Sequence, residues 1–89
     1  MKTILFYWSK GADVRRHIIR MIAECDRRKK PCYLNLLAAK LNLSHVAIKK
    51  HLDLLREEGY VEVLNPKGRP NYLVLSKKGV EVLREFSAR

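Results

Sequence analysis

Residues 44–61, with the sequence SHVAIKKHLDLLREEGYV, decide the fold of this chain. Ser44 is a good helix N-cap, because its hydroxyl can accept a hydrogen bond from a free amide of the first turn. Apolar residues then recur at spacings of four and three, which places them on one face of a helix. These residues are Ile48, Leu52 and Leu55. Gly59 tolerates the left-handed conformation that ends many helices, and the alternation Tyr-Val-Glu-Val that follows favours a strand. The stretch therefore predicts a capped helix, with basic residues on its outer side, that leads directly into a strand.

The chain length and charge limit what the protein can be. Its 89 residues correspond to a single domain, 1–89, and the hydrophobic fraction of 47% is typical of a globular protein. Nineteen Lys and Arg against nine Asp and Glu give a formal charge of +10, which favours a polyanionic partner or an anionic surface. The apolar run at residues 4–8 is too short for a signal peptide or a membrane span. We therefore expect a soluble intracellular protein with no membrane association.

Two helices are expected before this stretch. From Ala12 to about Lys29 an apolar stripe alternates with arginines, which we expect on the outer side of the helix. The stripe comprises Val14, Ile18, Ile19, Ile22 and Cys25, and the arginines are Arg15, Arg16, Arg20 and Arg27. Pro31 ends this helix, a shorter helix follows over 34–41, and only two or three residues separate it from Ser44, as in a helix-turn-helix. Residues 3–8 fit a short strand or the first turns of a helix equally well.

After Gly59 the pattern predicts two strands, about 60–64 and 71–75, and a last helix that Ser76 caps and that runs to about Phe86. The loop 65–70 between the strands contains two prolines and a glycine, which restrict its conformations. Lys67 and Arg69 give the tip of the loop a positive charge. The expected fold is therefore α+β, with a three-helix core, a two-stranded hairpin and a C-terminal helix.

This order of elements resembles the winged helix-turn-helix domain of small transcription regulators of the MarR and ArsR types. It is also similar to small regulators of hyperthermophilic archaea and their viruses. The resemblance covers roughly residues 12–86. It is carried by Leu37-Ala38, Leu41, Ser44, Ile48, His51-Leu52, Leu55, Gly59-Tyr60-Val61, and Ser76-Lys77-Lys78-Gly79 with Leu83.

The resemblance implies sequence-specific binding of double-stranded DNA, with recognition helix 45–58 in the major groove and wing 65–70 on the backbone or in the minor groove. The residues expected near DNA are Ser44, His45, Val46, Lys49, Lys50, His51, Lys67 and Arg69. It also implies a homodimer that reads palindromic sites. We expect the chain ends, 1–10 and 77–89, to form the dimer contact, because their apolar residues exceed what three short helices can cover. The location would be the cytoplasm, or the host cytoplasm for a viral protein.

Other interpretations of these residues remain open. Lys49 can pair with Asp53 one turn on and remain a solvated surface lysine. A winged helix can also serve as a protein–protein interaction module, and the acidic residues Asp53, Glu57 and Glu58 leave that alternative open. RNA binding would need exposed aromatic residues for base stacking. No catalytic motif, metal-ligand spacing, cofactor motif or small-molecule substrate is evident, and helix 34–41 lacks the thiol pair of metal-sensing ArsR proteins.

The two cysteines form a separate question. Cys25 continues the apolar stripe of its helix, so we expect it to be buried and inert. Cys32 lies beside Pro31 in a basic connection, where we expect it to be exposed and its thiolate to be favoured. If the source is a hyperthermophile, a disulfide is plausible, either between Cys25 and Cys32 or between subunits.

Overall fold

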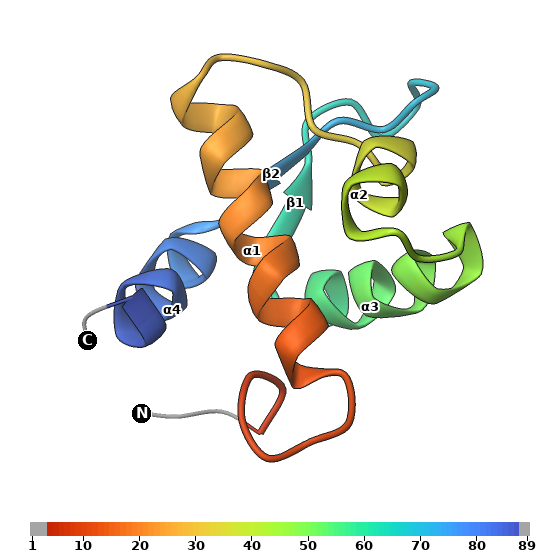
Figure 1. Ribbon diagram of the computed structural model, residues 1–89. Helices are drawn as coiled ribbons and strands as arrows, with labels where there is room; N and C mark the ends of the chain where they lie inside the picture. Colours follow the sequence, from red (N-terminus) through yellow and green to blue (C-terminus); the bar gives the residue numbers. More distant parts are fainter. Residues whose placement is uncertain (1–3, 88–89) are drawn as a thin grey trace.

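The computed structural model describes residues 4–87. In that range the elements follow the predicted order: α1 (Ala12–Arg27), α2 (Leu34–Leu41), α3 (His45–Glu57), β1 (Val61–Val63), β2 (Leu73–Leu75) and α4 (Lys77–Ser87). Helix α1 runs through the centre of the molecule, with α2 and α3 on one side, α4 on the other and the β-hairpin behind it (Figure 1). This arrangement confirms the α+β winged helix-turn-helix predicted from the sequence.

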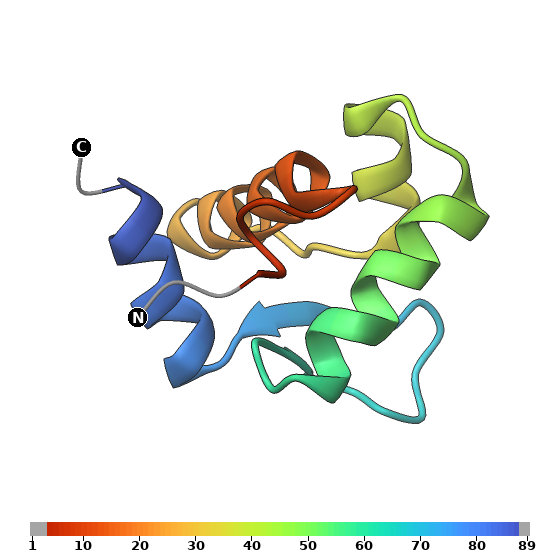
Figure 2. The ribbon, with the colours of Figure 1, turned by 90° about the horizontal axis from the view of Figure 1, so that it is seen from below.

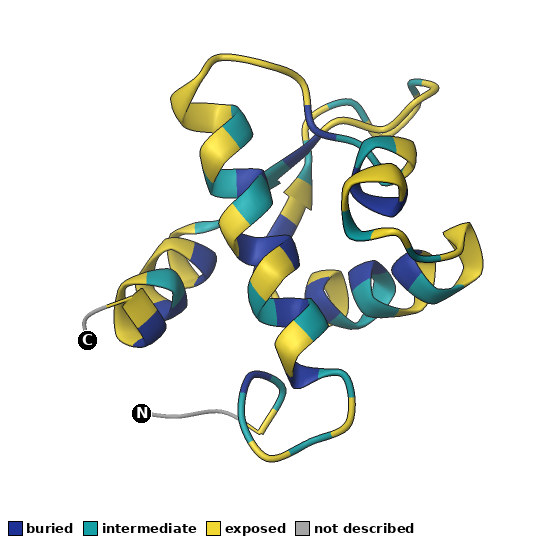
Figure 3. Ribbon diagram, viewed as in Figure 1, coloured by how far each residue is buried: buried dark blue, intermediate teal, exposed yellow. Residues whose placement is uncertain are grey.

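The core lies where α1 meets the other helices and the hairpin. Its largest side chains have no exposed surface, because each comes from the apolar stripe of its helix or from the first residues of the chain. These side chains are Phe6, Ile18, Ile19, Ile22, Leu37, Ile48 and Leu55. Figure 3 shows this division, with buried residues alternating with exposed ones along each helix.

The ends of the helices follow their capping residues. The Ser44 hydroxyl accepts a hydrogen bond from the amide of Ala47 at 3.1 Å, and α3 begins at the next residue. Gly59 has φ +83°, a left-handed conformation that ends the helix. The Ser76 hydroxyl accepts from the amide of Gly79 at 3.0 Å at the start of α4. The sequence therefore predicted these boundaries for the correct physical reason.

The hairpin is shorter than predicted. β1 and β2 pair antiparallel, with Val61 opposite Leu75 and Val63 opposite Leu73. One further hydrogen bond, from the amide of Leu64 to the carbonyl of Tyr72 at 2.9 Å, leads into the loop. The strands are therefore shorter, and the loop between them longer, than the alternation of residues predicted.

The N-terminal loop (residues 4–11) is neither a strand nor a helix. It consists of turns that pass over the end of α1 between α4 and α3, as Figure 2 shows. Its Phe6 is fully buried. The Phe6 ring packs edge-on against the Tyr60 ring, with 5.0 Å between the ring centroids, and beside the Phe86 ring, with 5.7 Å between the centroids. Of the predicted segment 3–8, Thr3 lies outside the described residues.

The burial of the two chain ends corrects one expectation. Phe6, Val82 and Phe86 are no more than 8% exposed within a single chain, so no partner is needed to cover them. The apolar side chains that the ends do expose are Ile4 at 68%, Trp8 at 80% and Val80 at 38%.

Arg15 is a second correction, because it is buried and not on the outer side of α1. Only 5% of its surface is exposed, and all three guanidinium nitrogens are bonded. Nε donates to the carbonyl of Leu5 at 2.6 Å, and Nη2 donates to the hydroxyl of Ser9 at 2.7 Å and to the carbonyl of Lys10 at 3.1 Å. The irregular N-terminal loop leaves carbonyls without strand or helix partners, and a buried arginine satisfies them.

The environments of the cysteines are the reverse of the prediction. Cys32 is buried at 2% exposure, whereas Cys25 is partly exposed, and both thiols are free. The backbone of Cys32 lies against β2, where its carbonyl accepts a hydrogen bond from the amide of Leu73 at 2.8 Å, and this contact keeps Cys32 at the core. Burial first, and the charge of Cys25 second, raise the pKa of the Cys32 thiol to about 12. The expected exposed, thiolate-favouring environment of Cys32 is therefore wrong.

Candidate nucleic-acid interface

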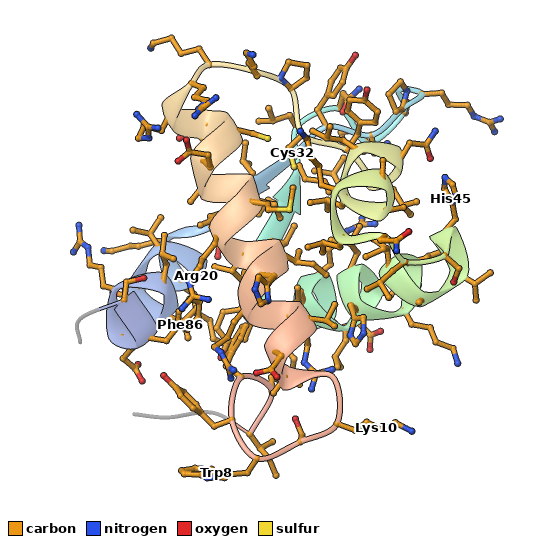
Figure 4. The ribbon with its side chains drawn as sticks, viewed as in Figure 1. Trp8, Lys10, Arg20, Cys32, His45 and Phe86 are labelled. Carbon is orange, nitrogen blue, oxygen red and sulfur yellow. The ribbon has the colours of Figure 1, made fainter. Side chains whose placement is uncertain are left out.

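The first two turns of α3 form an exposed basic surface. His45, Val46, Lys49 and Lys50 are all exposed, whereas Ile48 between them is buried in the core. Val46, an apolar residue, is 69% exposed. The side chain of His45 points away from the body of the molecule in Figure 4. These residues lie together, as the sequence predicted.

The two lysines differ in their surroundings. The Nζ of Lys49 lies 2.8 Å from a carboxylate oxygen of Asp53, one turn along the helix. Both partners are about half exposed or more, so the pair contributes little to stability. Asp53 nevertheless offsets part of the charge of Lys49, which makes Lys50 the stronger candidate for an electrostatic contact.

Ser44 and His51 differ from the rest of the predicted set. Ser44 is exposed, but its hydroxyl is occupied by the cap of α3. His51 is half-buried and turned toward α1, where its Nδ1 lies 3.2 Å from Nη1 of Arg15. Because arginine can only donate, Nδ1 must accept, and the imidazole is neutral. Burial first, and the charge of Arg15 second, lower the pKa of His51.

The wing loop (residues 65–70) holds Lys67 and Arg69 exposed at its tip. Two asparagines that the sequence analysis did not single out fix its shape. The Asn65 side chain donates to the carbonyl of Pro70 at 3.0 Å and accepts from the amide of Tyr72 at 2.7 Å. The Asn71 side chain donates to the carbonyls of Asn65 at 3.1 Å and Gly68 at 3.0 Å. Asparagines that flank a loop often bond the local backbone, which is the signal that could have identified them.

A hollow of about 250 Å³ separates α3 from the wing loop. Its walls combine apolar residues with polar groups that sequence reasoning also missed, chiefly Asn35, Arg56 and Asn71. The lining residues are Leu34, Asn35, Lys49, Leu52, Asp53, Arg56, Val63, Pro70, Asn71 and Leu73. The hollow brings the start of α2, the middle of α3 and the wing into one concave surface.

Charge is unevenly distributed along this surface. The second half of α3 and the outer side of β1 carry Asp53, Glu57 and Glu62, which with Arg56 line a second hollow of about 550 Å³. The positive charge therefore concentrates at the N-terminal half of α3 and at the wing tip. Major-groove helices of this type contact bases mainly through their N-terminal residues, so the acidic half does not prevent such a contact.

Residues 4–87 contain no obvious metal site. Within that range, no cluster of three or more His, Cys, Asp or Glu side chains could hold a metal ion. No helix in the described part of the chain is long and apolar enough to cross a membrane.

The arrangement of α2, α3 and the hairpin defines the class of this domain as a winged helix-turn-helix. No protein-family model matches the sequence, and a comparison with curated proteins finds no match. Solved structures do match. A mutant of ZitR from Lactococcus lactis has a TM-score of 0.71 at 24% identity, over 91% of this chain and 53% of the ZitR chain. FabT of Streptococcus pneumoniae, in a complex with DNA, has a TM-score of 0.72 at 21% identity, over 96% of this chain and 59% of FabT.

AF1382 of Archaeoglobus fulgidus is similar in size as well as in fold. Its TM-score is 0.77 at 19% identity, over 97% of this chain and 91% of AF1382. The present chain thus spans about half of ZitR but almost all of AF1382. At these identities the comparisons establish the shared fold.

Proposed function

We propose that the protein is a transcription regulator that binds double-stranded DNA, with α3 in the major groove and the wing loop on the backbone or in the minor groove. The observation that carries this proposal is the exposed set His45, Val46, Lys49 and Lys50 on the first turns of α3, beside a wing with a positive tip. A helix of this width fits the major groove, and cations there meet phosphates and base edges. A protein with this function acts inside the cell. It binds DNA and needs no catalytic group.

We assign different tasks to these residues. Lys50, Lys67 and Arg69 are exposed cations that position the protein on phosphates. We assign His45 and Lys49 to contacts with base edges, and Val46 to an apolar contact with a thymine methyl group. Ser44 acts through its cap, which fixes the start of α3. His51 faces Arg15, so its contribution to DNA binding is to hold α3 against α1.

The test is the selection of bound sequences from a random duplex pool, followed by affinity measurements at several salt concentrations. Each phosphate contact should add about 0.9 to the negative slope of log K against log salt. Lys50→Ala should weaken binding several-fold, whereas Lys29→Ala, at an exposed lysine just after the end of α1 (Figure 1), should not. A flat salt response, or equal effects of the two substitutions, would overturn the proposal.

The alternative from another class is a protein–protein interaction module. The observation that favours it is the acidic half of α3, with Asp53 beside Lys49 at 2.8 Å and Glu57 one turn on. In that case Asp53→Ala and Glu57→Ala would abolish capture of the partner, and no duplex would be enriched by selection. If DNA binding is correct, Asp53→Ala frees Lys49 and leaves duplex affinity unchanged or higher.

We further propose that the protein acts as a homodimer whose contact involves the chain ends. Ile4, Trp8 and Val80 support this, because they are the apolar side chains that the N-terminal loop and α4 expose. A two-fold dimer would present two copies of α3 to successive turns of DNA.

A further inference from the structure

Two thiols lie in contact where α1 ends. Cys25 is in the last turns of α1, Cys32 is in the segment that leads to α2, and the two cysteines approach to 3.8 Å. Both are free in this structure. The chain returns on itself between them, and the amide of Lys30 donates to the carbonyl of Cys25 at 2.9 Å. A disulfide needs a sulfur–sulfur distance of about 2 Å, so the two cysteines have to move closer together before they can be joined.

The two thiols differ in access. Cys25 is partly exposed and lines an open hollow of about 540 Å³, together with Met21, Glu24, Arg28, Lys30, Pro31, Tyr33, Leu36 and Lys40. Cys32 is 2% exposed and belongs to the hydrophobic core, in the upper part of the view in Figure 4. Cys25 is therefore the more accessible of the two thiols. Cys32 borders a hollow of about 250 Å³ beside Tyr72 and Leu73, but only 2% of its surface is exposed.

We propose that Cys25 and Cys32 form a redox-active pair, in which a hydroperoxide oxidises Cys25 and Cys32 then closes an intrachain disulfide. In the first step the Cys25 sulfur attacks the outer peroxide oxygen and the O–O bond breaks. The products are a Cys25 sulfenic acid and water or an alcohol. In the second step the Cys32 sulfur attacks the Cys25 sulfur, and the sulfenic oxygen leaves as water with the proton of Cys32. Two thiols are oxidised by two electrons in all, and one hydroperoxide is reduced.

The burial of Cys32 has two consequences. A second chain cannot reach it, so a bond between subunits through Cys32 is disfavoured. Its high pKa, raised to about 12 by burial and by the charge of Cys25, also keeps it unreactive toward free oxidants.

The bridge would connect three parts of the fold. The Cys32 carbonyl accepts from the amide of Leu73 at 2.8 Å, and the adjacent Tyr33 is the N-cap of α2. Joining Cys32 to Cys25 therefore ties the end of α1 to β2 and to the start of α2. This redox chemistry is independent of DNA binding.

The test treats the reduced protein with stoichiometric hydrogen peroxide and follows intact mass, free thiols and non-reducing gels. We expect a monomer that has lost two hydrogen masses and both thiols, and that dithiothreitol restores. Cys32→Ala should instead accumulate a Cys25 sulfenic acid that dimedone traps. In Cys25→Ala, Cys32 should stay a free thiol at the same peroxide dose.

Three results would overturn the proposal, and the first two need no variant. They are persistence of both thiols in the wild type, covalent dimers in place of the monomeric product, and loss of the Cys32 thiol in folded Cys25→Ala at the wild-type rate. Circular dichroism confirms that each variant is folded before it is compared.

Discussion

A single buried arginine links two parts of the molecule that would have separate tasks. Arg15 holds the N-terminal loop through Leu5, Ser9 and Lys10, and it holds α3 through His51. In these contacts the positively charged guanidinium of Arg15 donates only to neutral acceptors. The arrangement is favourable only while His51 is neutral. Protonation of His51 would remove the acceptor at Nδ1 and place a second cation beside the guanidinium.

The stability of the protein should therefore depend on pH through His51. Its pKa is lowered in the folded state from the ordinary value of about 6.5. Above about pH 6.5 both states are neutral, and the contribution is fully present. As the pH falls below about 6.5, the unfolded state binds the proton first, so the free energy of unfolding decreases until the folded pKa is passed.

The measurement is thermal unfolding between pH 8 and pH 5, for the wild type and for His51→Asn. The asparagine oxygen can accept from Arg15 but does not titrate, so the variant should lose less stability over the same range. Equal pH profiles would show that His51 is not the responsible group.

Substitution of either of two glycines by alanine should destabilise the protein, but for different physical reasons. A Cβ at Gly79 would lie 2.2 Å from the carbonyl oxygen of Tyr60, so backbone would have to move. At Gly59 the nearest atom is 3.9 Å away, and only the φ of +83° opposes a side chain. We expect Gly79→Ala to cost about 1–3 kcal/mol and Gly59→Ala about 1–2 kcal/mol, measured by urea unfolding. A Gly79→Ala variant as stable as the wild type would contradict the close approach.

For single residues, the sequence predicted those features that depend only on neighbouring residues in the chain. Ser44, Gly59 and Ser76 act as caps because capping involves only neighbouring residues. The burial of Arg15 and Cys32 could not be predicted, because it depends on where a distant loop and a distant strand come to lie. A helical stripe shows which side chains face inward only when they are apolar.

Among the elements, the wing depends on side chains more than on strands. β1 and β2 pair over three residues each, which is marginal for a hairpin, and the loop is held by Asn65 and Asn71. The prolines and glycine predicted a restricted loop, but not the asparagine bonds that restrict it. Those bonds need the two sides of the loop to be in register, which composition does not reveal.

Asn71→Ala should loosen the wing. The variant loses the hydrogen bonds to the carbonyls of Asn65, Pro66 and Gly68, each worth about 0.5–1.5 kcal/mol at most. We expect faster hydrogen exchange at the amide of Gly68, with the core amides unchanged. Arg69→Ala is the matched control, since it removes a charge from the same loop and none of these bonds. Equal exchange in the two variants would mean that Asn71 does not order the wing.

For the whole molecule, the sequence predicted the fold because every element agreed with it. Helix stripes, caps, a two-residue turn and a loop with prolines all pointed to one arrangement. The proposed dimer contact was harder to predict. Phe6, Val82 and Phe86 were expected to need a partner, yet the N-terminal loop folds back and covers them within the chain.

The apolar side chains that this folding leaves outside are the candidates for the dimer contact. Ile4 and Trp8 are 68% and 80% exposed on the N-terminal loop, and Val80 is 38% exposed on α4. If two copies meet through these residues, Ile4→Ser with Trp8→Ser should shift the protein toward the monomer at micromolar concentration, because each loses buried apolar area. Leu64→Ser is the matched control, since Leu64 is 66% exposed but lies at the end of β1.

Sedimentation measures the shift, and binding to one half-site or two measures its consequence. The chain measures 34 × 24 × 22 Å, so two copies can occupy successive turns about 34–36 Å apart on one side of DNA without overlap. The monomeric variant should keep its affinity for one half-site and lose the added affinity for two. A wild-type protein that sediments as a monomer with and without DNA would rule out the homodimer, while leaving the assignment of α3 to the major groove to be decided by the salt and lysine experiments.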